Sequence, residues 1–557
     1  MLQYLPIEIL HMIFREIACA RALARLSQVN KYMHRASIPF LYEEVVIQSS
    51  EALLGRLNIS PVSTRFESDG SRTIFHQLTL AKGLELVTPI RKITRKRCYE
   101  GKYIDHPDTG PEWKNNRCAR DKLIRVLDST FQHIVFHLPD HHLKSFSWQL
   151  GCCIPAAVLG SDGWLASKQE SIQSLSLTTD GTCHNIQDDI GGLLKLSQLR
   201  SFSWKGLHHY ESCIPAVIRG VLMSNSGHLE RLELEAVGGE FNSALSIGEF
   251  LGRSSLPPSE SALEPQDTDE YPMIAFHSLL HLSFGWISVK SARKILVSAV
   301  RVEKLRSLTL HNCPGTTEFI ETLEATGRAT KLRSFEVTLG EEEHLNWSRV
   351  FPALWLFLRS LECLEELFVS VQGRVSLVDT AVLNFTSTLK RLVLHFGLDE
   401  RERSELHLTT IPTIPLECVG VGYHSPLIWR QTLESNAITD AVKLIHCRIN
   451  GAKYRPLNST RLISSPSEAC SAKGGSQNCM LPMCMPCLRD FANWAFGPSG
   501  LRNLLVVAFG DFRMKVASDG RNFFYAASSD HQRSCFVLWV ARTTIVCWSR
   551  LMVLAGC

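Results

Sequence analysis

Between residues 140 and 400 the chain repeats one hydrophobic pattern: an apolar residue, two variable residues, an apolar residue, a variable residue and an apolar residue. The copies begin about 25 to 32 residues apart, except across one longer interval. They are Leu143/Phe146/Trp148, Ile172/Leu175/Leu177, Leu199/Phe202/Trp204, Leu229/Leu232/Leu234, Leu279/Leu282/Phe284, Leu305/Leu308/Leu310, Leu332/Phe335/Val337, Leu364/Leu367/Val369 and Leu389/Leu392/Leu394. Because the last two apolar residues of a copy lie two apart, they point to the same face of a strand. The pattern therefore predicts nine short strands.

Recurrence at a nearly constant interval indicates stacked repeats, because one such unit cannot cover its own apolar face. An L-x-x-L-x-L strand that recurs every 20–29 residues is the leucine-rich-repeat signature. The longer interval contains the Pro/Ser/Glu-rich stretch 253–272, which predicts a disordered insertion. Weaker copies flank the array at 75–81, 416–422, 442–449 and 501–510. We predict an α/β fold, an irregular leucine-rich-repeat solenoid (horseshoe); the alternative is several strands of an ordinary α/β protein.

A different pattern precedes the repeats. Leu5, Ile9, Ile13 and Ile17 lie four apart, which predicts an amphipathic helix. Pro6 suits the first turn of that helix, and Glu8 complements the positive end of its dipole. A second apolar series, Leu23, Leu26, Val29, Tyr32 and Met33, predicts one further helix that ends near 30–35. Fewer than about 50 residues rarely enclose a core alone, so we expect this apolar surface to dock on the solenoid or on another chain.

These residues also carry a family resemblance. Leu5-Pro6-x-Glu8-Ile9-Leu10-x-x-Ile13-Phe14, followed by Leu26-Ser27-x-Val29-Asn30-Lys31 and Leu41-Tyr42, resembles an F-box. Its place ahead of the repeats is similar to that in fungal F-box/leucine-rich-repeat proteins. The sequence departs from the family at 18–22, where a short segment replaces a longer acidic one. The structural alternative is an amphipathic cap on the first repeat.

The resemblance implies an adaptor function. An F-box binds the Skp-family linker subunit of a cullin-RING (SCF-type) ubiquitin ligase, and the repeats would bind a protein target. The implied linker contacts are Leu5, Pro6, Ile9, Ile13, Phe14, Val29 and Leu41. The alternative is a non-degradative interaction scaffold whose amino-terminal helices only cap the solenoid.

Side chains that alternate with the core positions are expected to line the concave sheet. The candidates for target binding are Lys205, Arg231, Glu233, Glu235, His311, Glu336 and Phe368. Small polar residues dominate the first third of this surface and charged residues its middle. Such a surface suits a protein or peptide better than a small molecule, which favours a deep apolar pocket.

Catalytic chemistry finds little support. The chain has no G-x-S-x-G elbow, P-loop or H-E-x-x-H motif, so we expect neither an enzyme nor a cofactor. His133, His137 and His141 are spaced like metal ligands, but Pro139 interrupts a helix there. Four thiols, Cys470, Cys479, Cys484 and Cys487, could hold zinc; we favour reduced cysteines in a loop, and predict no metal.

Net charge and hydropathy limit the classes of partner and the location that we expect for the chain. A net charge of +4, with 20% charged residues, does not indicate a nucleic-acid partner. The basic cluster 91–97 could be a nuclear-localisation patch or a contact for an acidic partner, but we favour a solvated loop. We find no secretory signal and no apolar stretch long enough for a membrane helix, so we expect a cytoplasmic or nuclear protein with reduced thiols.

The sequence thus predicts five segments. They are an F-box (1–48), a linker with first irregular repeats and the basic loop (49–142), the solenoid (143–450), a cysteine-containing loop with the last repeat (451–520) and an atypical tail (521–557). The tail is apolar without a clear period, unlike a capping repeat with a polar outer face, and we predict that it is not a well-packed end.

Overall fold

The structure is a computed structural model, and it describes much of the chain. The described residues are 5–17, 20–48, 80–87, 128, 131–132, 135–150, 154–179, 190–207, 213–236, 245–252, 274–328, 331–339, 347–372, 385, 387–397, 416–423, 430, 433–434, 441–449, 490–509, 522–526 and 536–540. Two compact units divide the chain, unit 1 (Met1–Leu305) and unit 2 (Arg306–Cys557).

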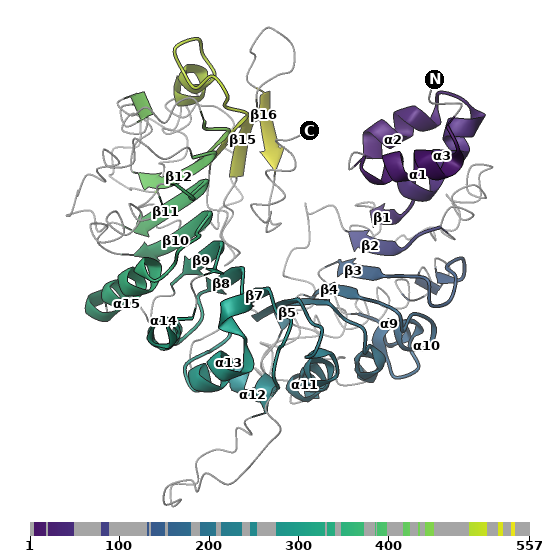
Figure 1. Cartoon of the computed structure of the whole chain (residues 1–557), viewed down its shortest axis with the longest axis horizontal. Helices are drawn as coiled ribbons and strands as arrows, with labels where there is room; N and C mark the ends of the chain where they lie inside the picture. The colour runs from purple at the N-terminus through teal and green to yellow at the C-terminus, as the bar shows by residue number, and fades with distance from the viewer. Residues whose placement is uncertain are drawn as a thin grey trace, which may run out of the picture. The chain divides into compact units, whose positions relative to one another are not determined.

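Unit 1 opens with three helices, α1 (Ile7–Arg15), α2 (Ala20–Ser27) and α3 (Lys31–Leu41) (Figure 1). Glu8 lies in the first turn of α1, as predicted, and Pro6 occupies the N-cap position just before that turn. The single second helix predicted from the apolar series is wrong. The side chain of Asn30 accepts a hydrogen bond from the Met33 backbone N–H at 2.8 Å, and this cap starts a separate helix.

Seven parallel strands follow in unit 1, each hydrogen-bonded to the next in sequence order. They are β1 (Glu44–Gln48), β2 (Gly83–Val87), β3 (Ser145–Gln149), β4 (Ser174–Thr178), β5 (Ser201–Leu207), β6 (Arg231–Ala236) and β7 (His281–Gly285). The α/β class and the parallel, solenoid-like repetition that the sequence predicts are confirmed. Consecutive parallel strands joined by helical return segments are the arrangement that stacked repeats require.

The register of this sheet joins the equivalent positions of each repeat. One row runs through Phe146, Leu175, Phe202, Leu232 and Leu282, and the next through Trp148, Leu177, Trp204, Leu234 and Phe284. All ten side chains are buried. Full burial of such a side chain contributes about 1.5–3 kcal/mol, so the two rows form the stabilising spine of unit 1.

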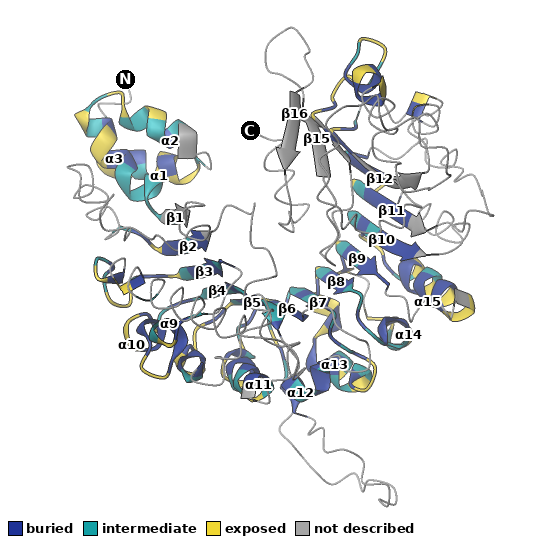
Figure 2. Ribbon diagram, turned by 180° about the vertical axis from the view of Figure 1, so that it is seen from behind, coloured by how far each residue is buried: buried dark blue, intermediate teal, exposed yellow. Residues whose placement is uncertain are grey.

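Short helices return the chain along one face of this sheet (Figures 1 and 2). They are α9 (Ala156–Leu159), α10 (Trp164–Lys168), η3 (Gly191–Lys195), α11 (Cys213–Asn225), α12 (Ile247–Leu251), α13 (Arg293–Ala299) and η5 (Val302–Lys304). We call the opposite face, which no described helix of unit 1 covers, the open face.

Buried amides connect the return segments to the strands. The Asn225 side chain accepts a hydrogen bond from the Leu199 N–H at 2.7 Å and donates to the carbonyls of Leu196 and Val221. Gln169 accepts from the Leu143 N–H at 3.0 Å in the same way. Both side chains are fully buried, so each satisfies backbone groups that would otherwise be desolvated without a partner.

Unit 2 continues the same construction. Its parallel strands are β8 (Ser307–His311), β9 (Ser334–Thr338), β10 (Glu366–Gln372), β11 (Arg391–Gly397), β12 (Cys418–Tyr423), β13 (Leu444–Ile449) and β14 (Val506–Phe509). Helices α14 (Thr316–Thr326) and α15 (Trp347–Arg359) follow β8 and β9. The weak copies predicted at 416–422, 442–449 and 501–510 each contain one of these strands. Residues 75–79 of the remaining copy lie outside the described residues, and the strand nearest to it is β2.

Two further strands, β15 (Asn522–Ala526) and β16 (Phe536–Val540), extend the sheet of unit 2 with antiparallel pairing. The apolar residues of the tail follow no clear period, so these strands were not predicted. Insertion 253–272, the basic cluster 91–97 and the thiols between Cys470 and Cys487 lie outside the described residues. Within the described part of the chain, no helix has the length and apolar character needed to cross a membrane.

Candidate functional site

Helix α1 carries apolar side chains on two of its faces. Leu10 and Phe14 point into a small core that Leu23, Met33 and Ala36 complete from α2 and α3. Ile9 and Ile13, one turn apart, are instead 37% and 38% exposed. The three helices therefore close their own core and still present an apolar surface outward.

Two more side chains of the helices are exposed apolar groups. Met12 on α1 is 58% exposed and Val29, between α2 and α3, is 65% exposed. We call Ile9, Met12, Ile13 and Val29 the apolar surface of the helical module. Large apolar side chains left exposed on a module of three short helices are typical of an interaction surface.

The predicted linker contacts divide between this surface and the core. Ile9, Ile13 and Val29 are exposed, and so is Pro6. Phe14 is only 1% exposed, so its assignment as a contact residue is wrong: it is a core residue, with its ring edge-to-face against Phe40. Leu5 and Leu41 are half-buried and pack against the same core. The Tyr32 hydroxyl donates to the Leu5 carbonyl at 2.7 Å, which fixes the start of α1 against α3.

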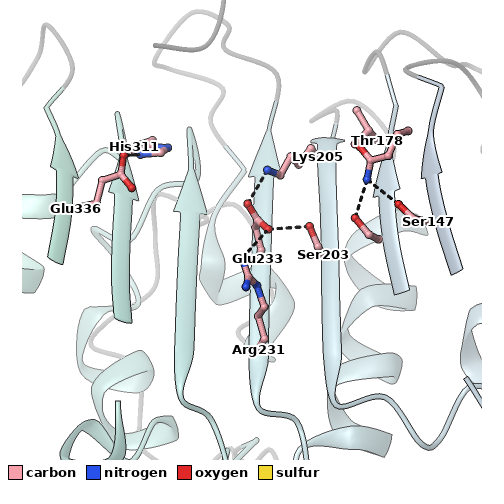
Figure 3. Close-up of polar contacts among 10 residues, drawn as sticks. Ser147, Thr178, Ser203, Lys205, Arg231, Glu233, His311 and Glu336 are labelled. Atoms are coloured by element: carbon pink, nitrogen blue, oxygen red, sulfur yellow. Dashed lines mark hydrogen bonds and ion pairs between the residues drawn. The ribbon is translucent and has the colours of Figure 1, made fainter. Parts of the chain in front are cut away.

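The open face of β3 and β4 is lined by hydroxyl and amide groups, which hydrogen-bond within and between the two strands (Figure 3). The Gln149 amide donates to the Ser147 and Ser176 hydroxyls at 3.0 and 2.9 Å. Its carbonyl oxygen accepts from the Thr178 hydroxyl at 2.7 Å. These side chains are half-buried and uncharged, so the surface offers both donors and acceptors with no net charge.

Charged residues replace the hydroxyls at β6 (Figure 3). Glu233 lies 2.7 Å from the Lys205 ammonium and 3.8 Å from the Arg231 guanidinium, and accepts a hydrogen bond from the Ser203 hydroxyl at 3.0 Å. Burial raises the pKa of the Glu233 carboxyl, but Lys205, Arg231 and Ser203 together outweigh it, so its pKa falls below the usual value. Three of the predicted target-binding residues therefore form one ionic cluster.

Glu235 behaves differently from the prediction that it lines an accessible surface. Its side chain is buried, beside Lys205 in the register of β5 and β6. On the next strand it faces Gly285, where an added Cβ would lie 2.6 Å from its Cγ. Glycine at 285 thus leaves room for the Glu235 stem, which makes Glu235 a packing residue of the open face.

The remaining candidates lie in unit 2. His311 on β8 and Glu336 on β9 are brought together, with 2.9 Å between the imidazole Nε2 and the carboxylate. Phe368 on β10 packs edge-to-face against His395 of β11, with ring centroids 5.5 Å apart. Both are diagonal pairs between adjacent strands, because the register sets Glu336 opposite Thr309 and His395 opposite Ser370.

Sequence reasoning missed Gln149 and Thr178, which organise the uncharged part of the open face. Each directly follows the last apolar residue of its L-x-x-L-x-L copy. Continuing the alternation of outward-facing residues by one more position would therefore have found both. Among the described residues, no group of His, Cys, Asp or Glu is arranged to hold a metal ion. His141 has a positive φ of 56° in a turn, and its backbone N–H bonds the Lys168 carbonyl.

Comparison with known proteins adds no name to this geometry. No protein-family model matches the chain, and no curated protein matches its sequence significantly.

Proposed function

We propose that the chain is a substrate-recognition adaptor of a cullin-RING ubiquitin ligase, with an F-box that binds the Skp-family linker and leucine-rich repeats that bind a protein target. The observation that carries the proposal is the exposure of Ile9 and Ile13 on a helix whose opposite face closes a core of its own.

This division favours docking over capping. If the helices served only to cap the first repeat, the apolar stripe of α1 would be expected beneath that repeat. Instead the core residues of the module all come from α1–α3, and Ile9 and Ile13 remain exposed. Burying apolar area on a partner supplies roughly 25 cal/mol per Å², which makes this surface a suitable anchor.

The repeats support the second half of the proposal. An open sheet face with hydroxyl, amide and charged side chains can hydrogen-bond a polypeptide along its length. In this proposed role the chain carries out no chemistry itself. Its contribution is to hold a target close to the bound conjugating enzyme, because a raised effective concentration accelerates ubiquitin transfer.

The test is co-purification with a Skp-family linker after co-expression. Ile9→Asp plus Ile13→Asp places two carboxylates in the proposed interface, and we expect binding to weaken by at least about 100-fold, since two anchors are lost and two charges are desolvated. Size-exclusion chromatography and isothermal titration measure the loss.

The matched control is Met223→Asp plus Leu356→Asp. These side chains lie on α11 and α15, and each is 44% exposed, similar to the α1 pair. Linker binding should be unchanged in this control. Retained binding in the α1 variant, or equal loss in both variants, contradicts the proposal and leaves the interaction-scaffold alternative.

A further inference from the structure

The residues immediately before the parallel strands β8 to β13 of unit 2 form a rim along the sheet. The backbone carbonyl at each rim position accepts an N–H from the next, at 2.7 to 2.8 Å, so successive rim side chains are neighbours. In order the positions are Arg306, Arg333, Glu365, Lys390, Glu417 and Lys443.

Most of this rim alternates in charge and pairs internally. Glu365 lies 2.8 Å from Lys390 and 3.5 Å from Arg333, and Glu417 lies 3.5 Å from Lys443. The hydrogen bond from Lys390 is the main reason that the pKa of Glu365 lies below its usual value. Alternation is the expected arrangement, because like charges on adjacent strands repel.

The alternation fails at Arg306 and Arg333, two cations on adjacent strands about 4.8 Å apart. The same repeat as Arg333 adds Arg328 and Lys331, and all four side chains are exposed. No described residue forms an ion pair or side-chain hydrogen bond with Arg306, Arg328 or Lys331, and Arg333 shares Glu365 with Lys390. We call these four residues the rim basic cluster.

We propose that the rim basic cluster binds a short acidic segment of a partner protein, with Asp or Glu carboxylates against the Arg and Lys side chains. Guanidinium groups suit carboxylates because they offer paired donors in a fixed plane. This inference concerns a surface separate from α1 and does not depend on linker binding.

The surroundings favour a short segment over an extended polyanion. In the same unit, Glu324 lies in the last turn of α14, four residues before Arg328, and the next rim position is Glu365. Duplex DNA carries one charge about every 1.7 Å of axis, and an anionic membrane is a broad plane, so either would also meet these carboxylates. A segment with a few carboxylates would not.

The experiment is fluorescence anisotropy with the full chain at low ionic strength. The probe is a labelled peptide of alternating Glu and Ser, and the neutral comparison has Gln in place of Glu. We expect the Glu peptide to bind and to weaken as salt is added, while the Gln peptide does not bind.

The double variant Arg306→Glu plus Arg333→Glu should lower the affinity for the Glu peptide by about tenfold. The milder variant Arg306→Gln plus Arg333→Gln should lower it by about threefold, and it serves as the test if charge reversal disturbs folding. The control is Lys144→Glu plus Lys290→Glu, two exposed cations of unit 1 that change the net charge equally. Its affinity should stay within about twofold of the unmodified chain.

Three results would overturn the proposal. One is equal loss in the control, which would assign binding to net charge alone. Another is absence of binding, or equal affinity for the Gln peptide. The third is tighter binding of poly(U) or phosphatidylserine vesicles that the Arg306/Arg333 variants abolish, which would assign the cluster to a different polyanion.

Discussion

The open face of the sheet and the outward face of α1, both in unit 1, differ in how far their side chains find partners within the chain. On the open face of β3–β6, hydroxyls, amides and charges find partners on adjacent strands, as Gln149 and Glu233 do. On α1, Ile9 and Ile13 face outward although the neighbouring Leu10 and Phe14 are completely covered.

The difference follows from repetition. A repeat has a copy of itself on each side, so its apolar and polar rows each meet a matching row. Within the described residues the helical module has no neighbouring copy, and its three helices cover one face of α1 and leave the other. Apolar surface without an internal partner indicates an external one more strongly than a satisfied polar surface does.

The largest expected effect tests the buried side of this comparison. Trp204→Ala removes a fully buried side chain from the spine beneath the open face, and its indole N–H donates to the Thr179 hydroxyl at 3.3 Å. We expect a loss of about 3–5 kcal/mol of local stability, measured by hydrogen exchange of the β4–β6 amides. Because the module has a separate core, protection in α1–α3 should change little; equal loss there would show that the cores are coupled.

A pair of adjacent residues tests the two faces of α1. Phe14→Ala should lower the stability of the helical module by about 3 kcal/mol, because a cavity replaces a buried ring. Ile13→Ala, at an exposed position, should change it by no more than about 0.5 kcal/mol. Hydrogen exchange of α1–α3 in the isolated chain measures both. Similar losses would mean that Ile13 is covered in solution.

A loss smaller than that of Trp204→Ala or Phe14→Ala is expected on the satisfied polar surface. Glu233→Gln removes the charge that pairs with Lys205, and we expect β5–β6 to lose about 1–2 kcal/mol of local stability at neutral pH. Because the pKa of Glu233 is lower in the folded chain, its contribution is present above the unfolded value of about 4.3 and is lost as pH falls through the folded value.

The measurement is hydrogen exchange of β5 and β6 against pH, with Lys144→Gln as an exposed control. In the unmodified chain the stability of these strands should fall as pH drops below about 4.3, and the Glu233→Gln variant should lack that component. An identical pH profile in both chains would show that ionisation of Glu233 does not contribute to the stability of β5 and β6.

The repeats were predictable because their signal is periodic and their neighbours repeat it. Phe202 and Leu232 occupy the same place in their copies, and the register pairs them as the spacing requires. The start of α3 was not predicted because it depends on one capping side chain, Asn30, within a continuous apolar series. The strands β15 and β16 lie in the tail, whose apolar residues follow no clear period.

The candidate surfaces were harder to predict than the strands. Apolar spacing places Ile13 and Phe14 equally well on a contact stripe, and only the packing of α2 and α3 separates them. Alternation places Glu235 on the open face, but the small size of Gly285 lets its stem lie flat and buried. Both outcomes depend on neighbours that are distant in sequence.

The passage from α3 to β1 is short, with only Tyr42 and Glu43 between them. The Glu43 carbonyl accepts the N–H groups of Lys82 and Gly83, and its carboxylate lies 3.0 Å from the Lys82 ammonium. These contacts fix the junction to the start of β2, so it is not a flexible linker. A rigid junction would hold a protein bound to the helices at a set distance and angle from a protein bound to the sheet of unit 1.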